Sequence, residues 1–595
     1  MLSRIQTILG SRRMLLWASL AAFLLTLPSL FTGLSCDDYA LRTVMLQQKN
    51  IPGVPASVCD AYAFVENDAD IIRKGRETGL YPWWMPDEFQ IAFLRPLACL
   101  THWVDFVFFN EASWLMHLHS ILWYALLGCV IALAYRRFIS TPWVAGLAAF
   151  MYVADEARAV GVGWLAGRSH ILAAIIGILV LLAHDRWRRN NWKPGAVFAV
   201  FWLGLGLFTS ESTLSICAYL FSYAMFIDRG RLAVRMATLI PYGIIVVLWR
   251  LLYNSLGYNV INSGLYLNPS QDLGRFMIVA PQRLIMLMYA QFAIPDSVLW
   301  NFTTPFWSVV CLVIATIALS FIAWVIWPII RTNRIAQFFT LGMILSALPS
   351  CTTLPAGRLL FFIGFGGMGL IALFLANVFE NQKEILSERP YSAKRLGVLF
   401  VVIHLILSPI LLPPAQLFTY YMGRANILAA NSVPEPLAEN ERLVFVNVPS
   451  SLRMTYLPYI RESLGYSVPA KKWLLSADFS SLEIHRIDNR TLTIKPENGF
   501  FASPWAQTFY NIGIPVKKGF VRELPGLTAT VSIVTDDGRP AEVRYEFSVP
   551  LEDKSLRWLT WTSEGFAAFL LPSPGETIYL KRLPLLWWLV NPFKT

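Results

Sequence analysis

Long apolar runs, separated by short polar connections, occupy most of this chain between residues 14 and 413. The first run, Met14–Leu34, has the length of roughly 20 residues that an α-helix needs to cross a bilayer. Ten further runs of similar character follow at 113–135, 142–157, 162–183, 195–210, 211–227, 236–255, 305–330, 335–350, 357–379 and 396–413. The pattern therefore predicts an α-helical polytopic membrane protein with about eleven transmembrane helices.

Basic residues gather in alternate connections between the predicted helices. They precede the first helix at Arg4, Arg12 and Arg13, and they recur within 136–137, 186–193, 229–235, 331–334 and 383–395. The positive-inside rule assigns such connections to the cytoplasm. We therefore expect a multi-pass membrane protein with a cytoplasmic N-terminus and an outward-facing C-terminal domain.

Three longer segments then face outward. The first is the loop 36–112, and the last is the chain that follows Pro414. The third, 256–304, contains the apolar run Phe276–Ile294, for which the pattern leaves open a position at the interface or within the membrane. This organisation divides the chain into a transmembrane domain, residues 1–415, and an extracytoplasmic domain, residues 416–595.

The extracytoplasmic domain has a different periodicity. Alternating or β-branched runs occupy Arg442–Val448, Ser481–Ile494, Ala529–Val534 and Glu542–Val549, and turn signals such as Asp488-Asn489 separate them. These runs predict a mainly antiparallel β-rich domain with one helix near Met454–Leu464. The final apolar run, Leu583–Val590, is too short to span a bilayer, so we expect it to pack on this domain or touch the membrane.

Composition excludes several classes of protein. Hydrophobic residues make up 56% of the chain and charged residues 15%, which is incompatible with a soluble globular enzyme or a disordered chain. Basic residues outnumber acidic residues by 49 to 38, but the predicted cytoplasmic connections account for the excess, so it does not indicate a nucleic-acid partner. The seven cysteines show no metal-binding spacing.

Charged residues cluster at the predicted outer ends of the helices. Asp37 and Asp38 directly follow the first helix, where a carboxylate is either a solvated helix end or a general base that deprotonates an acceptor hydroxyl. Asp87, a candidate for a supporting role, lies in an aromatic, proline-rich stretch that leads to Arg95. This stretch is typical of a loop packed on the membrane surface.

Arginines recur at the same ends. Snorkelling to the interface explains any one of Arg95, Arg168, Arg250 and Arg358. Together, on the side with few basic loops, they indicate binding of an anionic lipid phosphate, which arginine grips in bidentate fashion.

Other polar residues are candidates for supporting roles. Glu156, or its neighbour Asp155, is a candidate partner for Arg168, and Glu211 is either a helix cap or a further acid of the site. His117 is either a packing residue or part of the site, and its separation from His119 by two positions disfavours a metal site.

In combination, these residues resemble the polytopic GT-C glycosyltransferases, in particular the protein O-mannosyltransferases and the transmembrane-and-TPR O-mannosyltransferases. The matching pieces are Asp37-Asp38, Arg95-Pro96-Leu97, Met116-His117, Trp164…Gly167-Arg168, Ser210-Glu211 and Gly357-Arg358-Leu359-Leu360-Phe361, together with the Pro82–Trp84 stretch found in bacterial relatives. The resemblance covers roughly residues 14–415 and none of the C-terminal domain.

The resemblance to bacterial members implies an inverting transfer of a sugar from a polyprenyl-phosphate donor to a hydroxyl. This transfer would take place at the outer, periplasmic face of the bacterial inner membrane. Asp37 or Asp38 would be the catalytic base, and Arg358 would bind the departing phosphate. Arg168 and Arg95 would support the donor site together with His117. Members of this fold differ in their need for a divalent metal, and no ligand set stands out here, so the cofactor remains open.

The chain also departs from the resembled branch. It reads Asp155-Glu156-Ala157-Arg158 where that branch has a His-Pro and a Glu, and it has a β domain in place of TPR repeats. The acceptor, whether a protein, a lipid or a polysaccharide, therefore does not carry over. Two other classes remain as alternatives: a transporter or flippase of a lipid-linked anion, and a non-catalytic envelope assembly protein.

Overall fold

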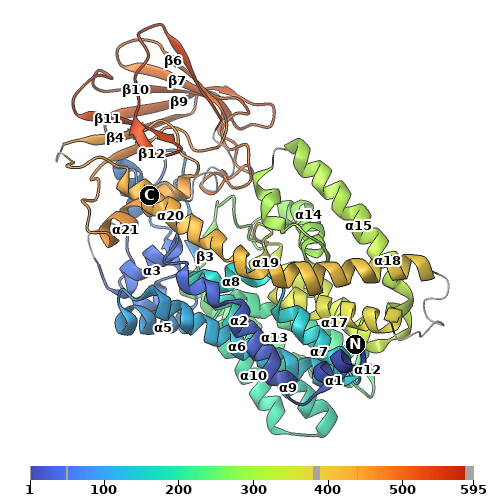
Figure 1. Cartoon of the computed structure of the whole chain (residues 1–595). Helices are drawn as coiled ribbons and strands as arrows, with labels where there is room; N and C mark the ends of the chain where they lie inside the picture. Colours follow the sequence, from blue (N-terminus) through green and yellow to red (C-terminus); the bar gives the residue numbers. More distant parts are fainter. Residues whose placement is uncertain are drawn as a thin grey trace.

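A computed structural model describes residues 2–48, 51, 53–303, 305–379, 389–437 and 440–582, so the run Leu583–Val590 lies outside the described residues. The chain forms a large helical bundle with a β-rich region stacked on one end of it (Figure 1). The N-terminus lies near the opposite end of the bundle.

Helices occupy all eleven predicted membrane segments. Among the described residues, seven stretches are long and apolar enough to cross a membrane: Met14–Phe31, Ser113–Phe138, Leu165–Asn190, Leu232–Ser255, Phe306–Thr332, Gly357–Phe379 and Pro390–Asn431. Their principal helices are α2 (Met14–Leu25), α6 (Ser113–Phe138), α9 (Arg168–Asn190), α13 (Ile240–Ser255), α15 (Pro305–Thr332), α17 (Leu360–Phe379) and α18 (Pro390–Val401). The other four predicted segments contain shorter helices: α7 (Pro142–Val153), α10 (Pro194–Leu207), α11 (Ile216–Phe226) and α16 (Arg334–Ser350). Seven spanning helices, rather than eleven, thus meet the criterion of length and composition.

Helix α7 is shorter than the predicted membrane segment 142–157. We expected this helix to continue to residue 157, but Asp155 accepts a hydrogen bond from the backbone N–H of Ala157 at 3.2 Å. Such a local side-chain bond competes with the helical pattern. The chain therefore leaves α7 and enters the short helices η4 (Glu156–Arg158), α8 (Ala159–Gly163) and η5 (Leu165–Gly167).

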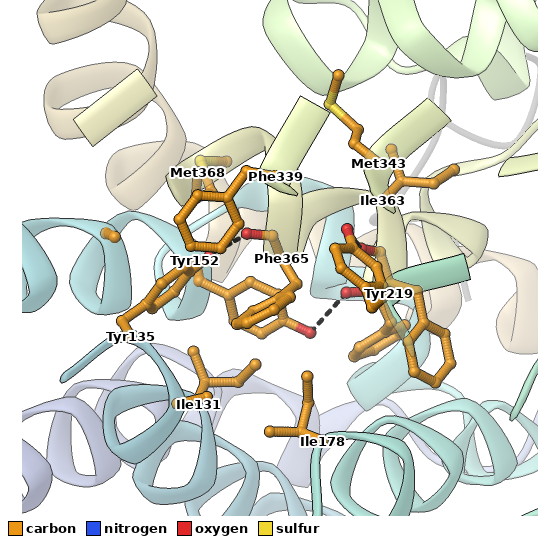
Figure 2. Close-up of a cluster of buried hydrophobic side chains, with 14 of the residues drawn as sticks. Ile131, Tyr135, Tyr152, Ile178, Tyr219, Phe339, Met343, Ile363, Phe365 and Met368 are labelled. Carbon is orange, nitrogen blue, oxygen red and sulfur yellow. Dashed lines mark hydrogen bonds between the residues drawn. The ribbon is translucent and has the colours of Figure 1, made fainter. Parts of the chain in front are cut away.

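Buried aromatic residues hold α17 at the centre of the bundle (Figure 2). Tyr135 of α6 and Tyr219 of α11 each donate a hydrogen bond of 2.6 Å to backbone carbonyls of α17, at Phe365 and Phe362 respectively. A Cβ atom at Gly366 would lie 2.5 Å from the carbonyl oxygen of Phe339, so α16 and α17 approach closely only because this residue is glycine. The start of α17, just after Arg358, is consequently a well-anchored position.

The long loops at this end of the bundle form a cap over it. Its helices are α3 (Asp37–Met45), α4 (Ala69–Thr78), α5 (Pro96–Val104) and α14 (Leu273–Phe292), with the short helices η2 (Val58–Asp60), η3 (Asp105–Phe109) and η7 (Ser297–Phe302). Three further short helices, η1 (Leu27–Phe31), η6 (Glu211–Ser215) and η8 (Gly357–Leu359), belong to predicted membrane segments. Strands β1 (Ala63–Val65), β2 (Gln90–Ala92) and β3 (Asn259–Ile261) form one antiparallel sheet that joins two loops distant in sequence. The basic end of the bundle carries α1 (Leu2–Gly10) and α12 (Leu232–Ala237).

The last membrane segment is longer than predicted. Helix α18 continues through η9 (Val402–Leu407) and α19 (Ser408–Ala415) into α20 (Leu417–Asn431), past the expected domain boundary at residue 415. The first strand of the β-rich region begins only at Arg442. Helical structure therefore extends from the bundle into the C-terminal region.

Two sheets build the C-terminal region. A six-stranded antiparallel sheet has the order β13-β6-β7-β10-β9-β8, and a four-stranded sheet has the order β12-β11-β4-β5. The strands are β4 (Arg442–Phe445), β5 (Lys472–Leu474), β6 (Leu482–Arg486), β7 (Thr491–Pro496), β8 (Val521–Leu524), β9 (Leu527–Val534), β10 (Pro540–Phe547), β11 (Leu556–Thr562), β12 (Gly565–Ala568) and β13 (Thr577–Leu580). The predicted strands and the predicted helix, α21 (Ser451–Ser463), are confirmed.

The second sheet departs from the expected antiparallel pairing. Strand β4 runs parallel to both β5 and β11. Parallel neighbours require a crossover connection, and α21 provides one between β4 and β5. The same helix packs against α3, so the C-terminal region contacts the segment that follows the first membrane helix.

Candidate functional site

The two adjacent acids, Asp37 and Asp38, form the first turn of α3, and we call them the acid pair. Carboxylates at this position are favoured by the partial positive charge of a helix N-terminus. The chain reaches α3 through Cys36, whose φ of 47° lies in the left-handed region. This turn directs the two neighbouring side chains to different surroundings.

Asp38 is fully buried, and both of its carboxylate oxygens accept hydrogen bonds from backbone N–H groups. Its Oδ2 accepts a hydrogen bond from the N–H of Ser35 at 3.0 Å, and its Oδ1 accepts one from the N–H of Ala166 at 2.9 Å. Burial raises the pKa of Asp38 to about 8, although both hydrogen bonds oppose this effect. Asp38 therefore ties the start of α3 to the turn that precedes α9.

Asp37 has a partly exposed side chain and lies between two structural regions. Its carboxylate accepts a hydrogen bond from the hydroxyl of Tyr456, on α21 of the C-terminal region. Burial raises the pKa of Asp37, and the Tyr456 hydrogen bond and the charges of Arg358 and Arg95 act in the opposite direction. Asp37 thus lies within the electrostatic reach of two arginines.

Arg358 has an uncommitted guanidinium. It lies on η8 with a partly exposed side chain, and its Cζ is 6.0 Å from the centre of the Trp164 ring. Within the described part of the chain it forms no ion pair or hydrogen bond through its side chain. Its backbone neighbour Gly357 donates a hydrogen bond of 3.2 Å to Oδ2 of Asp296, which anchors the start of η8.

Arg95, by contrast, is paired. Its Nε and Nη2 both lie 2.8 Å from Oε2 of Glu211, and its guanidinium stacks 4.5 Å from the centre of the Phe93 ring. The structure therefore brings together Arg95 and Glu211, two of the predicted site residues. Their pairing neutralises much of the charge that Arg95 presents to Asp37.

Arg168 is fully enclosed in protein. It forms an ion pair of 2.5 Å with Asp105, and its Nε and Nη2 donate hydrogen bonds of 2.9 Å to Ser120 and to the carbonyl of Met116. The expectation that Asp155 or Glu156 pairs with Arg168 was wrong, because Asp105 of the first loop takes this place. Arg168 has 0% exposure, so a structural role accounts for its contacts better than contact with a lipid phosphate.

His117 is also buried, and it supports the chain that leads to the acid pair. Its Nε2 lies 2.8 Å from the carbonyl oxygen of Gly33 and 3.1 Å from the hydroxyl of Thr32. His117 therefore positions the exit from the first membrane helix.

The remaining predicted residues, Glu156 and Asp87, form no hydrogen bond or ion pair with Asp37. Glu156 is on η4, which contacts η8, and its buried Oε2 has no hydrogen-bond partner among the described residues. Asp87 is largely exposed, and it pairs with Arg76 and, at 2.8 Å, with Arg522 of β8. Asp87 therefore links the first loop to the C-terminal region. Its ion-pair partners are not residues that bind the acid pair.

Two residues that contact this site were missed in the sequence. Tyr456 lies in a helix with an ordinary amphipathic pattern, and no local signal places it beside Asp37. Asp296 is the N-cap of η7, and its side chain accepts a hydrogen bond of 3.0 Å from the backbone N–H of Val298. A helix cap was therefore the only role that the local sequence indicated for Asp296.

No group of three or more histidine, cysteine or acidic side chains that could hold a metal ion occurs among the residues that the structure describes. Comparison with known proteins adds no assignment, because no protein-family model and no curated protein sequence matches the chain. The geometry around Asp37 and Arg358 is therefore the basis for a functional interpretation.

Proposed function

We propose that the chain is a membrane glycosyltransferase of GT-C type that uses a polyprenyl-phosphate-linked sugar at the periplasmic face of the bacterial inner membrane. The observation that carries this proposal is that the charge of Arg358, a cation without an ion pair or hydrogen bond through its side chain among the described residues, acts on the carboxylate of Asp37 at one end of an apolar helical bundle. The acceptor is a hydroxyl group of a protein, a lipid or a polysaccharide.

Asp37, rather than Asp38, is the base in this proposal. Both oxygens of Asp38 already accept backbone hydrogen bonds and the side chain is inaccessible, whereas Asp37 retains an exposed part. A base must come within hydrogen-bond reach of the proton that it removes. Asp38 then positions Asp37 by holding the first turn of α3 against the turn before α9.

Arg358 binds the leaving group. The acceptor oxygen loses its proton to Asp37 and attacks the anomeric carbon on the face opposite the phosphate, which inverts the configuration. The bond between the anomeric carbon and the phosphate oxygen breaks, and the electron pair leaves with the polyprenyl phosphate. A fixed guanidinium stabilises the charge that develops on that phosphate, because it needs no reorganisation during the step.

The surrounding residues fix this geometry. Asp296 and the packed start of α17 hold the backbone beside Arg358, and His117 holds the chain that enters the acid pair. Arg168 stabilises the first loop through Asp105. Tyr456 brings the C-terminal region to the base, so this region is suited to present the acceptor.

Mass spectrometry of the lipids that co-purify with the full-length protein tests the donor. We expect the wild type to retain a polyprenyl-phosphate sugar and Arg358→Ala to lose it. Arg250→Ala should retain it, because the Arg250 guanidinium lies 5.2 Å from the centre of the Tyr253 ring and is not one of the two arginines that act on Asp37. Retention that is unchanged in Arg358→Ala would contradict the placement of the phosphate.

Transfer of the sugar from that lipid then separates the alternatives. An Asp37→Asn variant should retain the donor but fail to transfer the sugar, with Glu546→Gln, an exposed residue on strand β10 of the C-terminal region, as the control. Undiminished transfer by Asp37→Asn would exclude the proposed base. Donor retention without transfer by the wild type would instead favour a flippase, and absence of any polyprenyl lipid would favour a non-catalytic assembly protein.

A further inference from the structure

A second region with binding character lies at the opposite, basic end of the bundle. A cavity of about 530 Å³ opens there between α6, α9 and α10. Both α6 and α10 pack on α9, and the cavity lies over the face of α9 between them. None of the residues proposed for sugar transfer lines it.

The spacing of the lining residues shows that each helix contributes a single face. Helix α9 provides Leu179, Leu182, Ala183 and Arg186, at intervals of three and four residues. Side chains at these intervals lie above one another on one side of a helix. Helix α6 contributes Leu133, Arg136 and Arg137 in the same manner, and α10 contributes Phe198 and Trp202.

The cavity is ordered from an apolar interior to a cationic mouth. Along α9 and along α6 the lining changes from leucine to arginine towards the end of the helix that carries the basic connections. Aromatic residues form the remaining wall, and the ring of Trp192 stacks on that of Phe198 with a centre-to-centre distance of 5.7 Å. This order of lining residues, from apolar to cationic, is complementary to an amphiphile with an anionic head and apolar chains.

The positive charge at the mouth is only partly neutralised. Arg137 pairs with the buried Asp185, which also pairs with Arg189 at 2.5 Å. Arg136 instead donates to the backbone carbonyls of Gly10 and Arg12, at 3.1 and 3.3 Å. Arg186 is exposed, and its side chain forms no ion pair or hydrogen bond with the described part of the protein. Two guanidinium groups at the mouth therefore lack a carboxylate partner among these residues.

We propose that this cavity binds an anionic phospholipid, with its phosphate between Arg136 and Arg186 and its acyl chains against the leucine and aromatic walls. Basic pockets between membrane helices on the cytoplasmic side are suited to anionic headgroups. A zwitterionic lipid fits the apolar wall equally well but gains less from the two arginines. Headgroup charge is therefore the property that the site distinguishes.

Native mass spectrometry of the full-length protein, titrated with phosphatidylglycerol or phosphatidylcholine in detergent, tests this site. Each arginine near a membrane surface contributes about 1 kcal/mol of attraction to an anionic headgroup, which corresponds to roughly fivefold in affinity. We expect Arg186→Gln to weaken phosphatidylglycerol binding about fivefold, and Leu182→Trp, which fills the apolar wall without a change in charge, to weaken it as well. The matched control is Arg231→Gln, which removes an exposed arginine at the same end but outside the cavity.

Three outcomes would overturn the proposal. Equal losses in Arg186→Gln and Arg231→Gln would indicate diffuse attraction to the basic surface. Equal retention of phosphatidylcholine and phosphatidylglycerol by the wild type would show that the headgroup is not recognised. Unchanged binding in both Arg186→Gln and Leu182→Trp would place the retained lipid elsewhere.

Discussion

The hydrogen bond between Tyr456 and Asp37 offers the sharpest test of the proposed base. Tyr456→Phe removes one hydroxyl and leaves the ring in place on α21. In the wild type, burial raises the pKa of Asp37, and the Tyr456 hydroxyl opposes this rise by donating to the carboxylate. Without the hydroxyl, the pKa of Asp37 rises further, because the charged form loses a hydrogen bond in a poorly solvated position.

The size of the effect follows from the energy of that contact. A hydrogen bond to a charged group contributes about 1.5–3 kcal/mol, so its removal lowers the deprotonated fraction of Asp37 by about 10- to 100-fold at pH values below its pKa. The proposed reaction requires deprotonated Asp37. The transfer rate of Tyr456→Phe should therefore fall by a similar factor at low pH and recover as the pH rises.

A pH–rate profile of sugar transfer by the purified full-length protein measures this shift. The acidic limb of the profile should move to higher pH in Tyr456→Phe, and the rates of the two proteins should approach each other at high pH. Tyr459→Phe provides a matched control on the same helix, because no hydrogen bond joins the Tyr459 hydroxyl to Asp37. It should leave the acidic limb unchanged.

Two results would refute this reasoning. If the acidic limb of Tyr456→Phe coincides with that of the wild type, Asp37 is not the group whose deprotonation limits transfer. If Tyr456→Phe lowers the rate equally at every pH, the hydroxyl organises the site without affecting the pKa of Asp37.

Three further predictions concern other charged groups of the protein. Arg168→Met should destabilise the protein by about 3–5 kcal/mol because it leaves Asp105 buried without its main partner, and Asp105→Leu in the same chain should restore most of the loss in detergent unfolding experiments. Arg522→Ala should change the free energy of unfolding by less than about 1 kcal/mol and leave sugar transfer intact, because its partner Asp87 is exposed. Burial raises the pKa of Asp38 to about 8, so the folded state binds its proton more tightly than the unfolded state, and stability should fall as pH rises from the ordinary carboxyl range towards 8. Unfolding midpoints at pH 5 and pH 8 should differ less in Asp38→Asn than in the wild type, and an equal difference would contradict the raised pKa.

Local patterns were sufficient for the membrane helices and for five of the ten strands described in the C-terminal region. A helix that lies in a bilayer needs a continuous apolar stretch, and a half-buried strand needs alternation, so both properties can be read within a short window. The lengths of the helices were less accurate. Asp155 ends α7 early through a side-chain hydrogen bond, whereas α18 to α20 continue through Pro413 and Pro414 to Asn431.

Sheet pairing and residue partners were harder to predict. The hydrophobic run of β4 does not reveal that its neighbours are parallel, since that depends on where α21 returns the chain. Similarly, the sequence shows Arg95 and Arg168 only as two arginines at predicted helix ends. In the structure Arg95 pairs with Glu211, and Arg168 pairs with Asp105.

The sequence by itself determined that the chain is an apolar helical protein suited to a bilayer, with charged residues concentrated at helix ends and a β-rich C-terminal region. These properties are sums over neighbouring residues, because hydropathy and periodicity do not depend on distant contacts. Only the tertiary structure decided which charged groups are engaged by neighbours. It encloses Arg168 and Asp38, leaves the Arg358 side chain without an ion-pair or hydrogen-bond partner among the described residues, and places Tyr456 against Asp37. The chemistry of an ionisable group depends on burial and on charges within a few ångströms, and those neighbours come from remote parts of the chain.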